Sequence, residues 1–176
     1  YDNAILYSDL LSSGRLLVVI LIYIIRIFLL IKFKGGIKLS EKLLRVGTTY
    51  IPVLSVGLST EWYINKLGAE LCYQDKNKAI LNFANQSIFL VKSKENQSSN
   101  FFDISGNEHF SLTFEVNGLN ALETIHQEFK EKQIRVGEIE ERGHAGKNFV
   151  FFDLNGNKFD VWSELSPDFK EKYQYK

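Results

Sequence analysis

Residues 146–162, GKNFVFFDLNGNKFDVW, hold two strand-like runs on either side of a short polar turn. Asn155-Gly156 is a strong hairpin signal, because both residue types tolerate the positive φ that a tight turn requires. The returning run, residues 158–162, carries Asp160 in its middle, although aspartate is depleted from strands. The stretch therefore predicts a β-hairpin with an acid whose position needs a reason other than strand propensity.

The strand and helix patterns that lead to this hairpin occur twice along the chain. In each copy, one strand and one helix precede three further strands. The first copy comprises strand 46–53, helix 57–67 and strands 69–74, 78–84 and 87–92, and the second comprises strand 109–116, helix 119–132 and strands 134–139, 147–154 and 158–163. Each helix covers one face of its sheet and leaves the other face free. We therefore predict an α+β fold in which two βαβββ modules form a curved mixed sheet around a cup, with the helices on the outer face.

The predicted domain, residues 44–164, has modules at 45–93 and 109–163, with the polar linker 94–108 between them and a C-terminal tail at 165–176. The 21 basic residues balance the 21 acidic ones, so no overall field favours nucleic acid as a partner. The single cysteine, Cys72, excludes an internal disulfide and fits a reducing, cytoplasmic compartment. Its apolar surroundings predict a buried, inert thiol.

Residues 1–38 admit two interpretations. Residues 16–31 are apolar apart from Arg26, so a helix over about 16–33 would anchor the chain in a membrane, and the lysines after it would keep the main domain in the cytoplasm. The other interpretation is upstream sequence that was translated by artefact in a bacterial gene. The chain contains no methionine, Lys34-Gly35-Gly36 can be encoded by a sequence resembling a ribosome-binding site, and Leu39 can be encoded by a TTG start codon. We favour the second interpretation, in which membrane contact plays no part.

Three stretches carry a resemblance to a known family. The stretch EWYINKLGAEL (61–71) follows the first strand, HFSLTFEV (109–116) leads to GLNALETIHQEFKEKQIRV (118–136), and GKNFVFFDLNGNKFDVW closes the second module. Together they resemble the vicinal oxygen chelate superfamily, which contains glyoxalase I, extradiol dioxygenases, fosfomycin-resistance enzymes and bleomycin-resistance binding proteins. The resemblance implies the duplicated cup fold, a small-molecule ligand and a homodimer.

Metal-using members of that superfamily commonly place His, His and Glu on three of the cup strands. The resemblance carries the two histidine positions onto Thr48 and Ser111, and the carboxylate position onto Asp160. Hydroxyls are poor substitutes for imidazole as metal ligands, so only one matched position suits a metal ion. A displaced site that uses His109 with Asp160 is the alternative, and these two residues are also the candidates for acid–base catalysis.

Strand alternation predicts which side chains face the cup. These are Thr48, Tyr50, His109, Ser111, Thr113, Asp160 and Trp162. We expect them to bind a small organic molecule without a cofactor, with Thr48 and Ser111 donating hydrogen bonds to Asp160. The alternative function is a divalent-metal-dependent lyase, dioxygenase or transferase of the glyoxalase type. His126 is predicted to lie on the surface, and His144 in a turn at the mouth of the cup.

Overall fold

The computed structural model describes residues 20–25, 43 and 45–175 of the chain, which divides into the units 1–44 and 45–176. Within the first unit, residues 20–25 are helical. Both interpretations of residues 1–38 therefore fall largely outside the described residues. No helix among those that the structure describes is both long enough and apolar enough to cross a membrane.

The first module is a four-stranded sheet with one helix. Its elements are β1 (Thr48–Val53), α3 (Val56–Leu67), β2 (Glu70–Gln74), β3 (Lys78–Phe83) and β4 (Gln86–Lys92). The strand order is β1-β4-β3-β2, with β1 parallel to β4 and the other pairs antiparallel. The helix begins after Ser55, whose side chain accepts a hydrogen bond from the Leu58 backbone N–H, and ends at Gly68, which has the left-handed φ of 73°.

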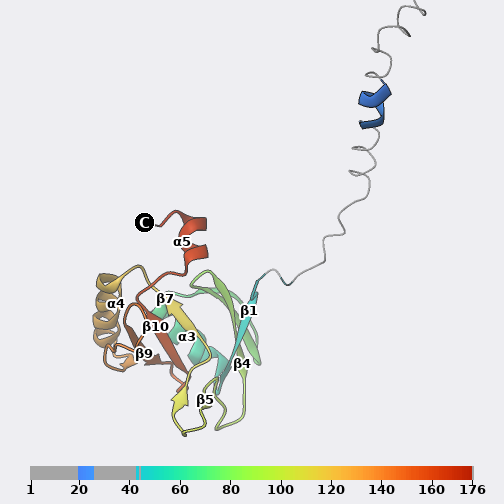
Figure 1. Ribbon diagram of the computed structural model, residues 1–176. Helices are drawn as coiled ribbons and strands as arrows, with labels where there is room; N and C mark the ends of the chain where they lie inside the picture. The colour runs from blue at the N-terminus through green and yellow to red at the C-terminus, as the bar shows by residue number, and fades with distance from the viewer. Residues whose placement is uncertain (1–19, 26–42, 44, 176) are drawn as a thin grey trace, which may run out of the picture. The chain divides into compact units, whose positions relative to one another are not determined.

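The second module repeats the first. Its elements are β7 (Thr113–Glu115), α4 (Leu119–Glu131), β8 (Arg135–Val136), β9 (Asn148–Phe152) and β10 (Lys158–Trp162). The strand order β7-β10-β9-β8, with β7 parallel to β10, is the order of the first sheet (Figure 1). The α+β architecture of two βαβββ modules that the sequence predicted is therefore confirmed.

Two segments outside the modules also form regular structure. In the linker, β5 (Phe101–Phe102) pairs with β6 (Glu108–His109), and in the tail α5 (Pro167–Tyr173) follows the second module. The predicted strand 109–116 is consequently interrupted: His109 belongs to the short β5–β6 ribbon, and only Thr113–Glu115 pairs with β10. The described residues thus form two four-stranded sheets and this two-stranded ribbon.

The turn between β9 and β10 joins the two modules. Within the turn, the Asp153 carboxylate accepts hydrogen bonds from the backbone N–H groups of Asn155 and Asn157. Asn157 Nδ2 donates to the Pro52 carbonyl at 3.0 Å, and Asn155 Oδ1 accepts from the Leu54 N–H at 3.0 Å, so the turn also bonds to the segment around the end of β1. Both amide side chains therefore connect elements about 100 positions apart in sequence.

A buried phenol completes this junction. Tyr63 on α3 is 1% exposed and donates its hydroxyl to Asp153 Oδ2 at 3.0 Å. Burial raises the pKa of the Asp153 carboxyl, and burial next to Asp153 raises the pKa of Tyr63 well above its usual value. The apolar core is continuous across the junction, with Ile51 and Leu90 from the first module and Phe149, Phe151 and Phe159 from the second.

Two predictions of burial were wrong. His126 on α4 is 7% exposed; its Nε2 lies 2.8 Å from the Gly137 carbonyl oxygen, and its ring packs edge-on against Phe149. The helical stripe therefore tolerates a histidine because a backbone acceptor satisfies its ring nitrogen. Cys72 is exposed, because all of β2 lies at the open edge of the first sheet.

Candidate functional site

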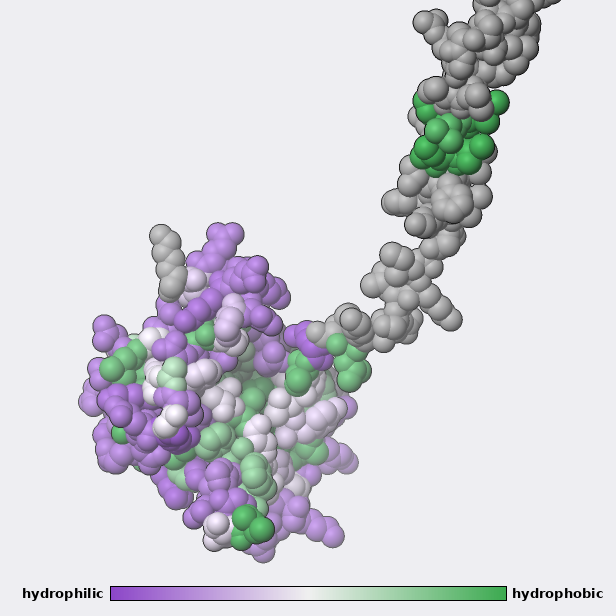
Figure 2. Space-filling model, viewed as in Figure 1, coloured by the Kyte–Doolittle hydropathy of each residue, from purple (hydrophilic) through white to green (hydrophobic). Residues whose placement is uncertain are grey.

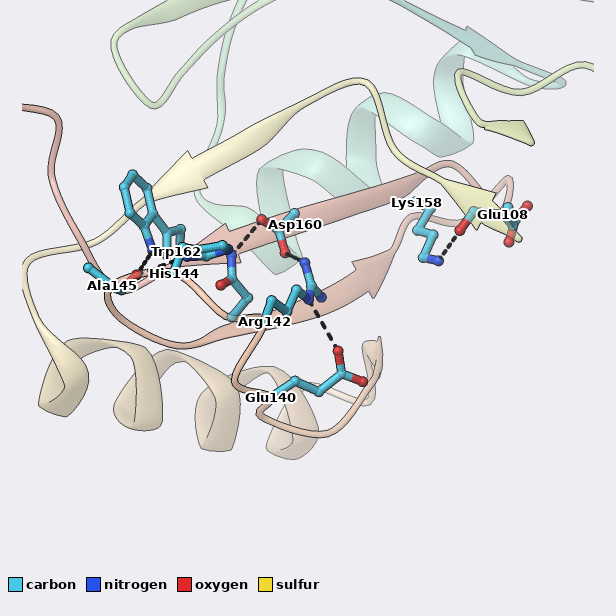
Figure 3. A network of polar contacts seen from close by, with 9 residues as sticks. Glu108, Glu140, Arg142, His144, Ala145, Lys158, Asp160 and Trp162 are labelled. Carbon is cyan, nitrogen blue, oxygen red and sulfur yellow. Dashed lines mark hydrogen bonds and ion pairs between the residues drawn. The ribbon is translucent and has the colours of Figure 1, made fainter. Parts of the chain in front are cut away.

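A cavity of about 780 Å³ lies on the free face of the second sheet. Its walls come from β6, β7, β9 and β10, together with the loop before β9 (Figure 3). The lining residues are Asn107, Glu108, His109, Phe110, Thr113, Glu140, Arg142, His144, Asn148, Val150, Lys158, Asp160 and Trp162. We call this cavity the cup.

Asp160 lies in the wall of the cup and is 2% exposed. The residue belongs to β10, which is hydrogen-bonded between β7 and β9. Its Oδ1 accepts a hydrogen bond from Arg142 Nη1 at 2.8 Å, and its Oδ2 accepts one from Asn148 Nδ2, also at 2.8 Å. The prediction that Thr48 and Ser111 donate to Asp160 was wrong. The donors are Arg142 and Asn148, which the strand pattern did not identify.

Arg142 is held at three points. Besides Asp160, its Nε lies 3.2 Å from Glu140 Oε2, and its guanidinium carbon lies 5.5 Å from the ring centre of Phe110. Its side chain is 25% exposed, compared with 3% for Asp160. The guanidinium therefore presents the partly open side of a buried ion pair to the cup (Figure 3). The sequence signal that could have revealed it is the turn RGHAGKN, residues 142–148, in which Arg142 and Asn148 flank His144.

Trp162 and His144 form an aromatic corner of the cup. Trp162 Nε1 donates to the Ala145 carbonyl at 2.8 Å, and the His144 ring meets the indole edge-on with centroids 5.7 Å apart. The backbone passes close to the indole at Gly146, which has a φ of 76°, and a Cβ there would lie 2.9 Å from Trp162 Nε1. Glycine is thus required both for the turn and for the place of the indole. The prediction that His144 lies near the mouth of the cup agrees with its position in the lining.

His109 reaches the cup from the β5–β6 ribbon. Its Nε2 lies 3.1 Å from Asp103 Oδ2, and its ring stacks on Phe101 with centroids 5.5 Å apart. Asp103 is itself ordered by Asn107, whose backbone N–H and side-chain amide both donate to the carboxylate. These bonds, with that to His109, lower the pKa of Asp103 to about 2. The carboxylate is therefore ionised at neutral pH and fixes one nitrogen of the imidazole.

The structure brings together four of the seven predicted cup residues: His109, Thr113, Asp160 and Trp162 all line the cup. Thr48 and Tyr50 lie on β1 of the other sheet and take no part in this lining. Ser111 turns away and donates its hydroxyl to the Ser99 carbonyl. The duplicated pattern predicted a first strand for each module, but the second of these strands is shorter than expected, and the pattern did not show that the cup would be lined without β1.

The polar groups of the cup are largely paired within the protein. Lys158 Nζ donates to the Glu108 carbonyl, and Glu108 Oε1 accepts from Asn100. Asn148 Oδ1 is buried and has no hydrogen-bond partner among the residues that the structure describes. Across those same residues, no group of three His, Cys, Asp or Glu side chains is arranged to hold a metal ion.

Comparison with solved structures identifies the fold. The lactoylglutathione lyase from Agrobacterium tumefaciens is 14% identical, with 69% of this chain and 95% of that chain covered and a TM-score of 0.55. The fosfomycin resistance protein FosX from Listeria monocytogenes, solved with Mn(II) and sulfate, is 13% identical over 75% and 99% of the two chains, with a TM-score of 0.57. An integron cassette protein from the mobile metagenome of Halifax Harbour sewage outfall is 16% identical over 69% and 100%, with a TM-score of 0.56.

These likenesses show the fold of the vicinal oxygen chelate superfamily, as the sequence predicted. No family model matches the sequence, and no curated protein matches it.

Proposed function

We propose that this chain binds a small organic molecule in the cup without using a metal ion. The main support for this proposal is the ion pair between Asp160 and Arg142. The carboxylate at the position matched to a metal ligand already has a cation at 2.8 Å on one oxygen and an amide on the other. A metal ion would have to displace the guanidinium, and the hydroxyls of Thr48 and Ser111 at the other matched positions are weak ligands. The donor set does not fit a divalent metal ion.

The lining of the cup indicates the kind of molecule it would take. Three carboxylates (Glu108, Glu140 and Asp160) and two cations (Arg142 and Lys158) leave a net charge of −1 with neutral histidines. Neutral or cationic molecules are therefore favoured over anions. Trp162 and Phe110 offer aromatic surface, while Arg142 and Thr113 offer hydrogen-bond donors, so an amphipathic molecule with ring character suits the cup.

A second copy of the chain is the proposed protein partner. The free face of the first sheet carries a row of apolar side chains in register across four strands: Tyr50, Phe89, Ile80 and Tyr73. The row is open to solvent at both ends, since Tyr50 is 64% and Tyr73 is 47% exposed. On the face of the domain seen in Figure 2, some hydrophobic residues reach the surface between hydrophilic ones. A homodimer that lays this face over the cup of its partner would bury both.

Sedimentation tests this dimer. Tyr50→Glu places a charge in the apolar row and should weaken dimerisation at least tenfold. Leu58→Glu, at a 60% exposed position on α3, is the matched control and should leave association unchanged. A monomeric native chain would contradict the proposed partner.

Cytoplasmic location stays a prediction from the sequence.

Metal-free acid–base chemistry is a second candidate function, favoured by the Asp103–His109 pair. Asp103 holds one imidazole nitrogen, and His109 lines the cup, so its ring is placed to exchange a proton with a bound molecule. Asp160 is a poor base, because Arg142 and Asn148 hold both of its oxygens. Under this candidate His109→Gln would abolish turnover of a ligand while leaving its binding constant within about threefold.

A thermal-shift screen of small organic molecules, with and without EDTA, tests the proposed function. A true ligand raises the melting temperature with occupancy and does so equally in EDTA, because stabilisation follows RT ln(1 + [L]/Kd). Trp162→Ala should weaken binding at least tenfold, whereas Trp62→Phe on α3, outside the cup, should not. Ligands that stabilise the protein only when Mn²⁺ or Zn²⁺ is added would contradict the proposal.

A further inference from the structure

A second cavity, of about 590 Å³, lies at the junction of the two modules. One side is formed by the start of β1 and by the turn between β3 and β4, and the other by β7 and the tail that contains α5. Thr113 lines both this cavity and the cup, so β7 is a wall common to the two. We call this space the junction cavity.

The junction cavity has mainly apolar walls. Ile88, which is 2% exposed, and Phe114 contribute core side chains, while Phe169 and Tyr175 contribute rings from the tail. Its volume falls within the range of about 300–1,000 Å³ that is usual for small-molecule sites. The lining thus has the size and polarity of a binding site rather than of a packing defect.

One buried polar atom in the lining lacks a partner. Gln86 follows the turn at Ala84-Asn85, where both residues have positive φ, and its Oε1 is buried without a hydrogen-bond donor among the described residues. An unsatisfied buried carbonyl costs about 1–3 kcal/mol. Gln86 belongs to the lining of the junction cavity, so a bound molecule whose N–H or O–H group reaches this oxygen would remove that cost.

The C-terminal helix closes the cavity without belonging to the core. No residue of α5 is buried, yet the helix is tied to β7 by Glu115, whose Oε2 accepts from the Ser166 N–H at 2.9 Å. The ring centroid of Phe169 lies 4.5 Å from that of Tyr173 and 5.9 Å from that of Tyr175, and the rings of Phe169 and Tyr175 line the cavity. The helix α5 therefore covers the cavity from the surface and is attached to β7 through the hydrogen bond to Glu115.

We propose that the junction cavity is a second small-molecule site, which takes a mainly apolar molecule that donates a hydrogen bond to Gln86 and is covered by α5. This site is independent of the cup and of its proposed function. The two differ in charge, since the cup is lined by five charged side chains, two of which form the Asp160–Arg142 ion pair, whereas Glu115 is the one charged side chain among the described residues that line the junction cavity.

Fluorescence titration of the full chain with 1-anilinonaphthalene-8-sulfonate tests the site, because this probe combines apolar rings with an N–H donor. We expect saturable binding of one probe per chain. Thr49→Trp, on β1 in the cavity lining, should fill the space and weaken binding at least tenfold, whereas Thr124→Trp, at an exposed position on α4, should have no effect. Equal affinity of the native chain and Thr49→Trp would overturn the proposal.

Two further measurements keep the test decisive if Thr49→Trp fails to fold. Gln86→Leu keeps the side-chain size and removes only the acceptor, so binding should weaken several-fold with the melting temperature unchanged or higher. A crystal of the full chain with the probe should show it between β1 and β7 beneath α5. Two results would overturn the proposal. One is probe that binds in the cup, so that Trp162→Ala, and not Thr49→Trp, abolishes its binding. The other is a crystal structure in which another protein segment fills the junction cavity.

Discussion

Arg142 Nη1 lies 2.8 Å from Oδ1 of Asp160, in a strand position where aspartate is otherwise unfavourable. The carboxylate is 3% exposed and the guanidinium side chain 25%, so the acid is neutralised from within the protein. This pairing explains why an acid is tolerated in the middle of β10. It also leaves the Arg142 guanidinium, rather than the Asp160 carboxylate, as the more exposed member of this pair in the cup.

Removing the arginine should leave an unpaired buried charge. We expect Arg142→Ala to lower the free energy of unfolding by about 3 kcal/mol, because breaking a buried ion pair costs more than the pair contributes. Denaturant unfolding measures this change. Glu140→Gln is the control, since its contact with Arg142 is exposed and should be worth about 0.5 kcal/mol. The double variant Arg142→Ala, Asp160→Asn should regain part of the lost unfolding free energy, because the unpaired charge is removed as well. Equal losses for Arg142→Ala and Glu140→Gln would contradict a buried ion pair.

The junction between the modules offers a matched pair of tyrosines. Tyr63 and Tyr73 each donate to an aspartate oxygen at 3.0 Å, but the first bond is buried and the second exposed. Tyr63→Phe should therefore cost about 2 kcal/mol of unfolding free energy, whereas Tyr73→Phe should leave the unfolding free energy nearly unchanged. Chemical denaturation of both variants checks the difference. If the two costs are equal, the Asp153 turn does not hold the modules together in the way described.

The Asp103 carboxyl should titrate with a pKa of about 2, because hydrogen bonds from Asn107 and His109 stabilise its charged form. The folded pKa lies below the usual 3.8, so its stabilising contribution is complete above about pH 4 and is lost as the pH falls toward 2. A carbon-detected NMR titration measures the midpoint. Asn107→Ala should move it upward by removing one of these bonds, and a midpoint near 3.8 in the native chain would show that the β5–β6 ribbon is not ordered in this way.

Two glycines in the loop before β9 allow the cost of a left-handed backbone to be measured apart from the cost of a steric clash. Gly143 and Gly146 have similar φ values, 80° and 76°, but a Cβ at Gly143 meets nothing within 4 Å, whereas one at Gly146 meets Ser163 Oγ at 2.6 Å. Gly143→Ala should cost about 1 kcal/mol from the left-handed backbone alone. Gly146→Ala should cost more and should shift the fluorescence of Trp162. Equal stabilities with unchanged fluorescence would mean that the indole does not rest against this loop.

The duplicated strand–helix pattern was enough to predict the two modules, the order of their elements along the chain and the closing hairpin, because alternation and turn residues are local properties. It also placed His109, Thr113, Asp160 and Trp162 on the cup. The partners of Asp160 could not be predicted, since Arg142 comes from an irregular loop whose path no periodicity specifies. The same holds for His126, whose burial depends on a carbonyl eleven residues further along the chain.

Metal content measures the central claim most directly. The purified full chain is incubated with Mn²⁺, Zn²⁺, Ni²⁺ or Fe²⁺, freed of loosely bound ions and assayed by elemental analysis beside Asp160→Asn. With Arg142 occupying the carboxylate, we predict no stoichiometric metal in either protein, and unchanged binding of any cup ligand in EDTA. One tightly bound ion per native chain, absent from Asp160→Asn, would contradict the account.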